Sequence, residues 1–175
     1  MSEETARNGG VGRRVFEEGD LVVYPNHGAG YVSGIEEKSV LGEVRRYYVV
    51  HVADGGLTLS IPADGDSGLR PCADGDDVEA ALELLRGGPE EMPANWNHRL
   101  KHNQEKLRSG EISHVAEVVR DLNSYGGAHG LSTGERTLLT KARRILISEV
   151  ALVRDIEVSE AESLIEDALR GDGAG

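Results

Sequence analysis

The sequence predicts an α+β protein in which a small antiparallel β-domain is followed by an all-α domain. In the first third of the chain, short runs of β-branched and aromatic residues alternate with turns rich in Gly, Pro and Asp. In the remainder, apolar residues recur at three- and four-residue spacing behind capping signatures. The predicted strands follow one another too closely for crossover helices, so they form a small barrel or a curled sheet.

Four segments have the composition of strands, and each is bounded by residues that end strands. They are 20–24, which stops at Pro25; 31–35, which follows the Gly-rich turn 27–30; 45–52, which is rich in Tyr and Val; and 57–61, which stops at Pro62. Asp54, Gly55 and Gly56 provide a hairpin turn between the last two segments. We expect an antiparallel sheet built from hairpins.

Five segments have the spacing of helices. They are 76–85, 95–108, 111–122, a long helix from Ser132 to about 153, and a last helix from Ser159 to about 169. Asn95 is the expected N-cap of the second, and Ser132 with Glu135 has the spacing of a capping box, which Ser159 and Glu162 repeat. The domain organisation expected from these elements is a disordered N-terminus over 1–14, a β-domain over 15–64, a linker over 65–75, a helical domain over 76–170 and a disordered tail over 171–175.

Charge is distributed unevenly along the chain. The 175 residues include 19 Lys and Arg against 31 Asp and Glu, a net charge of -12, which on average argues against nucleic-acid binding. Residues 96–144 nevertheless carry nine basic and five acidic side chains, whereas residues 61–95 carry two and nine. A basic segment that begins at the only Trp is therefore embedded in an acidic protein. Its affinity for free DNA should be weak.

Composition and motifs argue against several classes of function. No apolar run approaches the roughly 20 residues of a membrane helix, and the first 15 residues lack the apolar block of a secretory signal. A cytoplasmic protein without a membrane partner is expected, and the lone Cys72 fits a reducing compartment. No nucleophile elbow, phosphate-binding lysine loop or zinc-protease motif is present, and His98 and His102 lack a third zinc ligand. We expect no enzymatic activity, metal or cofactor.

The segment from Trp96 to Arg108 allows two interpretations. In the first, Trp96 protrudes from the first helical turn and wedges between bases in the minor groove, while nearby cations hold the DNA backbone. The cations in question are His98, Arg99 and Lys101, joined by Arg136, Lys141, Arg143 and Arg144 on the long helix. In the second, Trp96 forms a buried stripe with Leu100, Asn103 and Leu107, and the charges are simply solvated.

Residues 16–28, with the sequence FEEGDLVVYPNHG, resemble the opening of the CarD/CdnL family of bacterial transcription regulators. Transcription-repair coupling factor shares this opening in its polymerase-interacting domain. The resemblance continues through Leu57 to Pro62, PANW at 93–96, KLRSG at 106–110, VAEVVRDL at 115–122, GLS at 130–132 and KAR at 141–143. It covers residues 16–155 in collinear order, and the PANW and VAEVVRDL segments distinguish the regulators from the coupling factor.

The resemblance implies a Tudor/SH3-like N-terminal β-barrel that binds the RNA polymerase β subunit. It also implies a helical domain that contacts promoter DNA at the upstream edge of the transcription bubble. The family's wedge tryptophan corresponds to Trp96, its basic DNA contacts correspond to His98, Lys101 and Arg136, and its polymerase contacts correspond to Lys38, Val40 and Ser60. Ser60 stands where members often carry a basic residue. The protein is expected to act as a monomer that stabilises the promoter open complex.

The alternative is a protein of another class, an adaptor that binds a protein partner through its acidic segments and the edge of its sheet. In that case Trp96 belongs to the helical core and does not contact DNA. The exposure of the indole separates the two interpretations, because a wedge must protrude and a core residue must be shielded.

Overall fold

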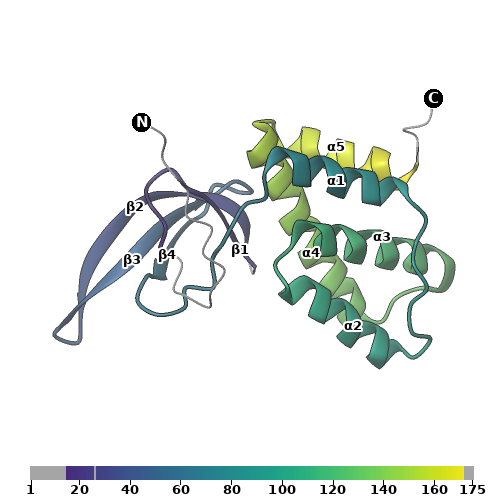
Figure 1. The fold of residues 1–175 in the computed structure, drawn as a ribbon. Coiled ribbons are helices and arrows are strands. Elements are labelled where there is room, and N and C mark those ends of the chain that lie inside the picture. Colours follow the sequence, from purple (N-terminus) through teal and green to yellow (C-terminus); the bar gives the residue numbers. More distant parts are fainter. Residues whose placement is uncertain (1–14, 26, 172–175) are drawn as a thin grey trace.

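The computed structural model describes residues 15–25 and 27–171 (Figure 1). An antiparallel sheet occupies one side of the molecule and five helices occupy the other. The predicted order of a β-domain followed by an all-α domain is confirmed. The disorder predicted for residues 1–14 and 171–175 falls outside the described residues except at Gly171, which forms a turn.

The sheet contains five strands in the order β4-β3-β2-β1-β5. Their bounds are β1 Leu21–Tyr24, β2 Gly28–Val40, β3 Glu43–Val52, β4 Thr58–Pro62 and β5 Arg70–Pro71. All neighbouring strands are antiparallel. The hairpin turn predicted at Asp54–Gly56 is present, with Gly55 and Gly56 at φ of 81° and 65°. The predicted turn at 27–30 is shorter than expected, because β2 begins at Gly28.

The sheet among the described residues is open rather than closed into a barrel, because β4 and β5 both remain edge strands. One face packs a small core instead. Phe16 and Tyr48 meet edge to face with ring centroids 5.8 Å apart, and the Phe16 amide donates to the Tyr48 hydroxyl at 3.2 Å. The other members of this core are Val22, Val32, Val50, Ile61 and Leu69. Leu69 and β5 come from the segment that we expected to be a linker.

The helices are α1 Gly75–Arg86, α2 Trp96–Arg108, α3 Ile112–His129, α4 Thr133–Arg154 and α5 Val158–Leu169. They share a second core to which α1, α3, α4 and α5 contribute most of the buried apolar side chains. Figure 1 shows α1 and α5 side by side, with α4 running past α3 toward the sheet. Within the described residues no helix combines the length and the apolar character needed to span a membrane.

Two helices differ from the sequence-based expectation. α3 runs to His129, seven residues beyond its predicted end, although Gly126 and Gly127 have low helix propensity. Tertiary packing compensates, because a Cβ on Gly126 would lie 3.1 Å from Leu131 Cγ, so the glycine allows the next loop to pack closely. The capping box predicted at Ser159 is wrong, since α5 begins at Val158 and its N-cap position, Glu157, makes no side-chain capping bond.

The sheet and the helices meet along a seam between α4 and the strands β1 and β2. The Ala29 amide donates a 2.8 Å hydrogen bond to Ser148 Oγ of α4. Neighbouring Gly28 has φ of 90°, and a Cβ there would lie 2.6 Å from the same oxygen. A second link joins Arg70 of β5 to the fully buried Glu149 through two 2.8 Å bonds, and the Ala73 amide also donates to Glu149 at 2.9 Å.

Candidate nucleic-acid interface

Trp96 is the first residue of α2 and is 51% exposed. The extended residue Asn95 caps the helix as predicted, because its side-chain oxygen accepts from the amides of Asn97 at 2.9 Å and His98 at 3.3 Å. The cap fixes the direction from which the chain enters the helix, and hence the position of the first side chain. The indole of Trp96 is therefore presented at a defined helix end.

The interpretation in which Trp96 belongs to the helical core is wrong. Asn103 is fully buried on the packed side of α2, and Leu100 and Leu107 are partly buried beside it. Trp96 has the helical spacing of this stripe but lies one turn beyond it, at the end of the helix. The residue spacing of the stripe extends to Trp96, but the core does not extend as far as this end of the helix.

Arg99 is buried, with 4% exposure, so the prediction that it contacts DNA is wrong. Its guanidinium donates to the Glu135 carboxylate and to the carbonyls of Pro93 at 3.2 Å and Ala94 at 3.1 Å. It also lies over the Tyr125 ring, 3.9 Å from the centroid. The Nε and Nη1 donors are thus used inside the protein, and burial shields the guanidinium from a phosphate.

Glu135 connects this arginine to the start of α4. The Ser132 side chain accepts from the Glu135 amide and the Glu135 side chain accepts from the Ser132 amide, so the predicted capping box is confirmed. Hydrogen bonding to Glu135 raises the pKa of Arg99 above its ordinary value. Burial raises the pKa of Glu135, but hydrogen bonds from Arg99 and Ser132 outweigh it and hold that pKa below its ordinary value. The pair is therefore fully charged.

Arg99 acts on the exposed tryptophan through the backbone. The two carbonyls that it holds belong to the residues that lead into Asn95 and Trp96, and its carboxylate partner belongs to α4. A buried, multiply bonded guanidinium has little freedom to move, so it ties the approach to α2 onto a second helix. Arg99 is a positioning residue for Trp96.

The other predicted DNA contacts remain available on the surface. His98 and Lys101 on α2 and Arg136 on α4 are exposed, and Lys141 is partly exposed. Most other cations of the helical domain are occupied by carboxylates. The paired ones are Arg86 with Glu83, Arg99 with Glu135, Lys106 with Glu117, Arg120 with Asp121, Arg143 with Glu166, Arg154 with Glu79 and Arg170 with Asp167.

Five Lys and Arg side chains of the helical domain form no ion pair within residues 15–25 and 27–171. They are Lys101, Arg108, Arg136, Lys141 and Arg144. All five lie on α2 and α4, the helices joined by the pair of Arg99 and Glu135. The positive face predicted on α4 is thus divided, because Arg143 is neutralised by Glu166 and Arg144 is not.

The residues predicted to contact polymerase all lie on strands of the sheet. Lys38 Nζ donates to Ser60 Oγ at 3.2 Å and lies 5.4 Å from the centroid of the Tyr47 ring. Val40, the last residue of β2, is 37% exposed. Lys38 of β2 reaches across β3 to Ser60 of the edge strand β4, and Val40 lies two residues farther along β2.

Sequence reasoning did not identify Tyr125 and Glu135 as partners of Arg99. The capping box marked Glu135 as a helix-start residue, but its second role depends on α2 lying beside α4. No spacing in the chain encodes a contact across 36 residues. Cys72 is partly buried, and desolvation raises the pKa of its thiol to about 12. No cluster of three or more His, Cys, Asp or Glu suited to a metal occurs among the described residues.

The described residues thus combine an open sheet with a helical domain that presents an exposed tryptophan and five cations without an ion pair. Residues 16–73 match the family described as CarD-like/TRCF RID domain, and residues 80–166 match the CarD C-terminal domain. The chain belongs to the CarD-like family of transcription regulators. It is 34% identical over 151 residues to the Bacillus subtilis (strain 168) protein named "Putative transcription factor YdeB", across 85% of this chain and 99% of that protein.

Proposed function

We propose that this protein binds the β subunit of RNA polymerase through its sheet and stabilises the promoter open complex by inserting Trp96 into the minor groove. The insertion occurs at the upstream edge of the bubble. The observation that carries the proposal is the exposed indole at the start of α2, which Arg99 positions beside unpaired cations. Family membership supports a polymerase partner in general. The protein acts as a monomer in the cytoplasm, where polymerase works.

The proposed mechanism relies on tethering. A protein with a net charge of -12 binds free DNA weakly, but docking on polymerase raises the effective concentration of the α2 surface at the promoter. Trp96 then enters a step that melting has already distorted, where less unstacking energy is needed than in intact duplex. Because the indole binds the melted state better than the closed one, the equilibrium shifts toward the open complex.

Removal of the indole should separate docking from stabilisation. Stacking of an aromatic side chain on a base contributes about 1–3 kcal/mol, so Trp96→Ala should shorten the lifetime of the open complex at least about fivefold relative to the unaltered protein. Its affinity for polymerase should not change. Competitor-challenge assays measure the lifetime, and a pull-down measures the affinity.

The matched control is Leu57→Ala, which removes a similarly exposed apolar side chain from the sheet domain. It should leave the open-complex lifetime unchanged. An undiminished lifetime with Trp96→Ala would refute the wedge assignment, and a shorter lifetime accompanied by lost polymerase binding would show that Trp96 acts in docking.

Charge reversal at Lys38 tests the polymerase surface. Lys38→Glu breaks the bond to Ser60 and places a negative charge on the proposed contact, which should weaken binding to the isolated β subunit by more than about tenfold. Arg86→Glu makes the same charge change on α1, away from the sheet, and should have no effect. Equal weakening by the two variants would mean that binding follows net charge and not this surface.

A further inference from the structure

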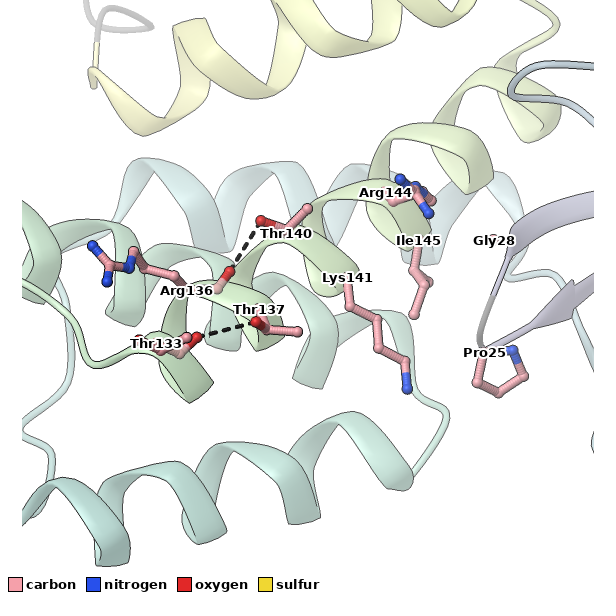
Figure 2. A pocket seen from close by; sticks show the side chains of 9 residues that line it. All are labelled: Pro25, Gly28, Thr133, Arg136, Thr137, Thr140, Lys141, Arg144 and Ile145. Atoms are coloured by element: carbon pink, nitrogen blue, oxygen red, sulfur yellow. Dashed lines mark hydrogen bonds between the residues drawn. The ribbon is translucent and has the colours of Figure 1, made fainter.

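The cavity of about 500 Å³ beside α4, which Figure 2 shows, is lined by Arg136, Lys141 and Arg144 and belongs to the cationic surface already considered as a DNA contact. A different feature of the helical domain lies on the approach to Trp96. Residues 87–95 join α1 to α2 and lead directly into this residue. Figure 1 shows them running along the helical domain from the end of α1 to the start of α2. We call residues 87–95 the strap.

The strap forms neither helix nor strand. It begins with two successive glycines, Gly87 and Gly88, and a Cβ on Gly88 would meet open space. Glycine restricts the backbone less than any other residue. The position of the strap therefore depends on bonds that it receives from the neighbouring helices.

A buried carboxylate of α3 holds the start of the strap. Asp121 is 1% exposed, and its Oδ1 accepts from the Glu90 amide at 3.1 Å and from Arg120 Nε at 2.8 Å. Arg120 Nη1 donates to the Leu84 carbonyl near the end of α1 at 3.4 Å. Arg120 Nη2 lies 3.9 Å from the Glu90 carboxylate. The pair of Arg120 and Asp121 thus joins α1, the strap and α3.

Polar groups of α2 hold the rest of the strap. The two buried residues of α2 are Arg99 and Asn103. Asn103 Nδ2 donates to Met92 Sδ at 3.4 Å, and Arg99 holds the next two carbonyls of the strap. The apolar residues of α2 are at most partly buried. Bonds to the strap therefore contribute much of what fixes this helix and its first residue.

The pair of Arg120 and Asp121 contributes specificity of position more than stability. Apolar residues of similar volume often replace a buried ion pair without loss of stability, but they cannot accept from a backbone amide. Trp96 is half exposed, so its own packing does not fix the indole. Immobilising a mobile side chain on binding costs free energy, and a pre-positioned one avoids that cost. A fixed strap would lower the cost of insertion.

We propose that Asp121 and Asn103 are positioning residues for Trp96, on which they act through the strap and without contact with DNA. The proposal rests on the proposed function and deepens it. Together with Arg99, these residues hold the strap at three places. The indole is thereby presented to the promoter already in place, by α3 as well as by α4.

Asp121→Ala removes the acceptor that holds the start of the strap. Because Trp96 is the only Trp, the fluorescence of the protein reports on this indole alone. Time-resolved anisotropy of the folded variant, measured without urea, should show a larger fast component from local motion of the indole. In the polymerase complex the open-complex lifetime should shorten at least about twofold, whereas the affinity for polymerase should not change.

Asp121→Asn tests whether the bond to the strap or the charge is responsible. It keeps an oxygen that can accept from the Glu90 amide and removes only the charge that faces Arg120. The urea midpoint of unfolding should fall, but the indole anisotropy and the open-complex lifetime should match those of the unaltered protein. Indole motion as large as that of Asp121→Ala would overturn the role of the strap bond.

Ile165→Ala is the control for stability. It removes a fully buried side chain from α5, which packs against α1 and α4, and should lower the urea midpoint without loosening the indole. If Asp121→Ala does not fold, Asn103→Ala decides the matter, because it leaves no charge unpaired and introduces the best helix former. It should increase the motion of the indole in the same way.

Unchanged anisotropy in Asp121→Ala overturns the inference, and so does an equal increase in Ile165→Ala. Anisotropy is measured on the protein alone, so it decides on the positioning role even where the proposed function fails. That failure would appear as an unchanged open-complex lifetime with Trp96→Ala. If Trp96→Ala shortens the lifetime and the anisotropies are equal, the proposed function stands and only the positioning role fails.

Discussion

Arg99 and Lys101 lie two positions apart on α2 and have opposite surroundings. Arg99 is enclosed by Glu135, Tyr125 and two backbone carbonyls, whereas Lys101 is exposed and makes no ion pair in the described part of the chain. The same charge therefore stabilises the fold at one position and remains available to a ligand at the other.

Substitution of the two residues should separate these roles. Arg99→Gln leaves the buried carboxylate of Glu135 without its partner and should lower the free energy of unfolding by about 3–5 kcal/mol. Lys101→Gln should change it by less than about 0.5 kcal/mol, as is usual for an exposed side chain. Urea denaturation monitored by circular dichroism measures both. Comparable losses in the two variants would contradict the buried role of Arg99.

The pH dependence of stability provides an independent test of the ion pair between Arg99 and Glu135. Because the folded-state pKa of Glu135 is below its ordinary value, its contribution is fully present above the unfolded pKa of about 4.3 and is lost as the pH falls through the folded value. The stability difference between the unaltered protein and Glu135→Gln should therefore be constant from pH 7 to about 5 and shrink below about pH 4.

For single residues, the pattern left the exposure of Trp96 open between two interpretations and only the family resemblance implied that it protrudes. The sequence predicted most of the exposed cations but misassigned Arg99. Charge and helical position are local properties and can be found by reading along the chain. Burial of an arginine depends on an aromatic ring and a carboxylate brought from α3 and α4. A cluster of basic residues on a helix therefore predicts a charged face without identifying which member serves the fold.

Ser132 and Ser159 show, for whole helices, that a local sequence pattern does not identify which candidate is used in the fold. Both have capping-box spacing in the sequence, but only Ser132 caps a helix, because α5 already begins at Val158. A capping signature indicates a possible start, and packing of the helix against its neighbours selects the one that is used.

Ser132→Ala should lower the free energy of unfolding by about 1 kcal/mol, the usual contribution of a side-chain N-cap. Ser159→Ala, a matched substitution inside the first turn of α5, should be neutral or slightly stabilising, since Ala has the higher helix propensity. Thermal unfolding measures both. A loss at Ser159 equal to that at Ser132 would mean that α5 is capped by its serine in solution.

Most strands and helices were predictable from residue spacing and from the residues that end elements. β2 is an exception, because it runs to Val40 and was predicted to end at residue 35. Three further features were not predictable. β5 contains two residues, too few for a pattern, and exists because Val22 and Val23 offer an unpaired edge. The end of α3 depends on Leu131 packing against Gly126. Closure of the sheet depends on the relation between β4 and β5, which lie at opposite edges. Each is settled by contacts between segments.

In the whole molecule, α4 connects the features on which the proposed function depends. Near its start, Glu135 holds Arg99 and thereby the approach to Trp96. Near its end, Ser148 and Glu149 bind Ala29 and Arg70 of the sheet domain. The length of α4 and its packing against the sheet therefore set the distance between the proposed polymerase contact and the indole.

Loss of the seam should uncouple the two domains. Glu149→Gln leaves Arg70 without a charged partner and weakens three hydrogen bonds across the seam, so unfolding should change from one transition to two. Trp96 fluorescence follows the helical domain, and amide hydrogen exchange at Val50 follows the sheet. Glu83→Gln, which breaks an exposed pair within α1, is the control. Coincident transitions in Glu149→Gln would show that apolar packing alone couples the domains.

The bond between Ala29 and Ser148 spans 119 residues of sequence, which has a consequence for synthesis on the ribosome. The sheet can fold early, but its orientation relative to Trp96 is fixed only after α4 has emerged. If the proposed function holds, a nascent chain stalled before Ser148 would present the Lys38 surface before the indole is oriented relative to it, and would bind polymerase without prolonging the open complex. Fragments ending before and after Ser148 should therefore bind polymerase equally and differ in the lifetime that they confer.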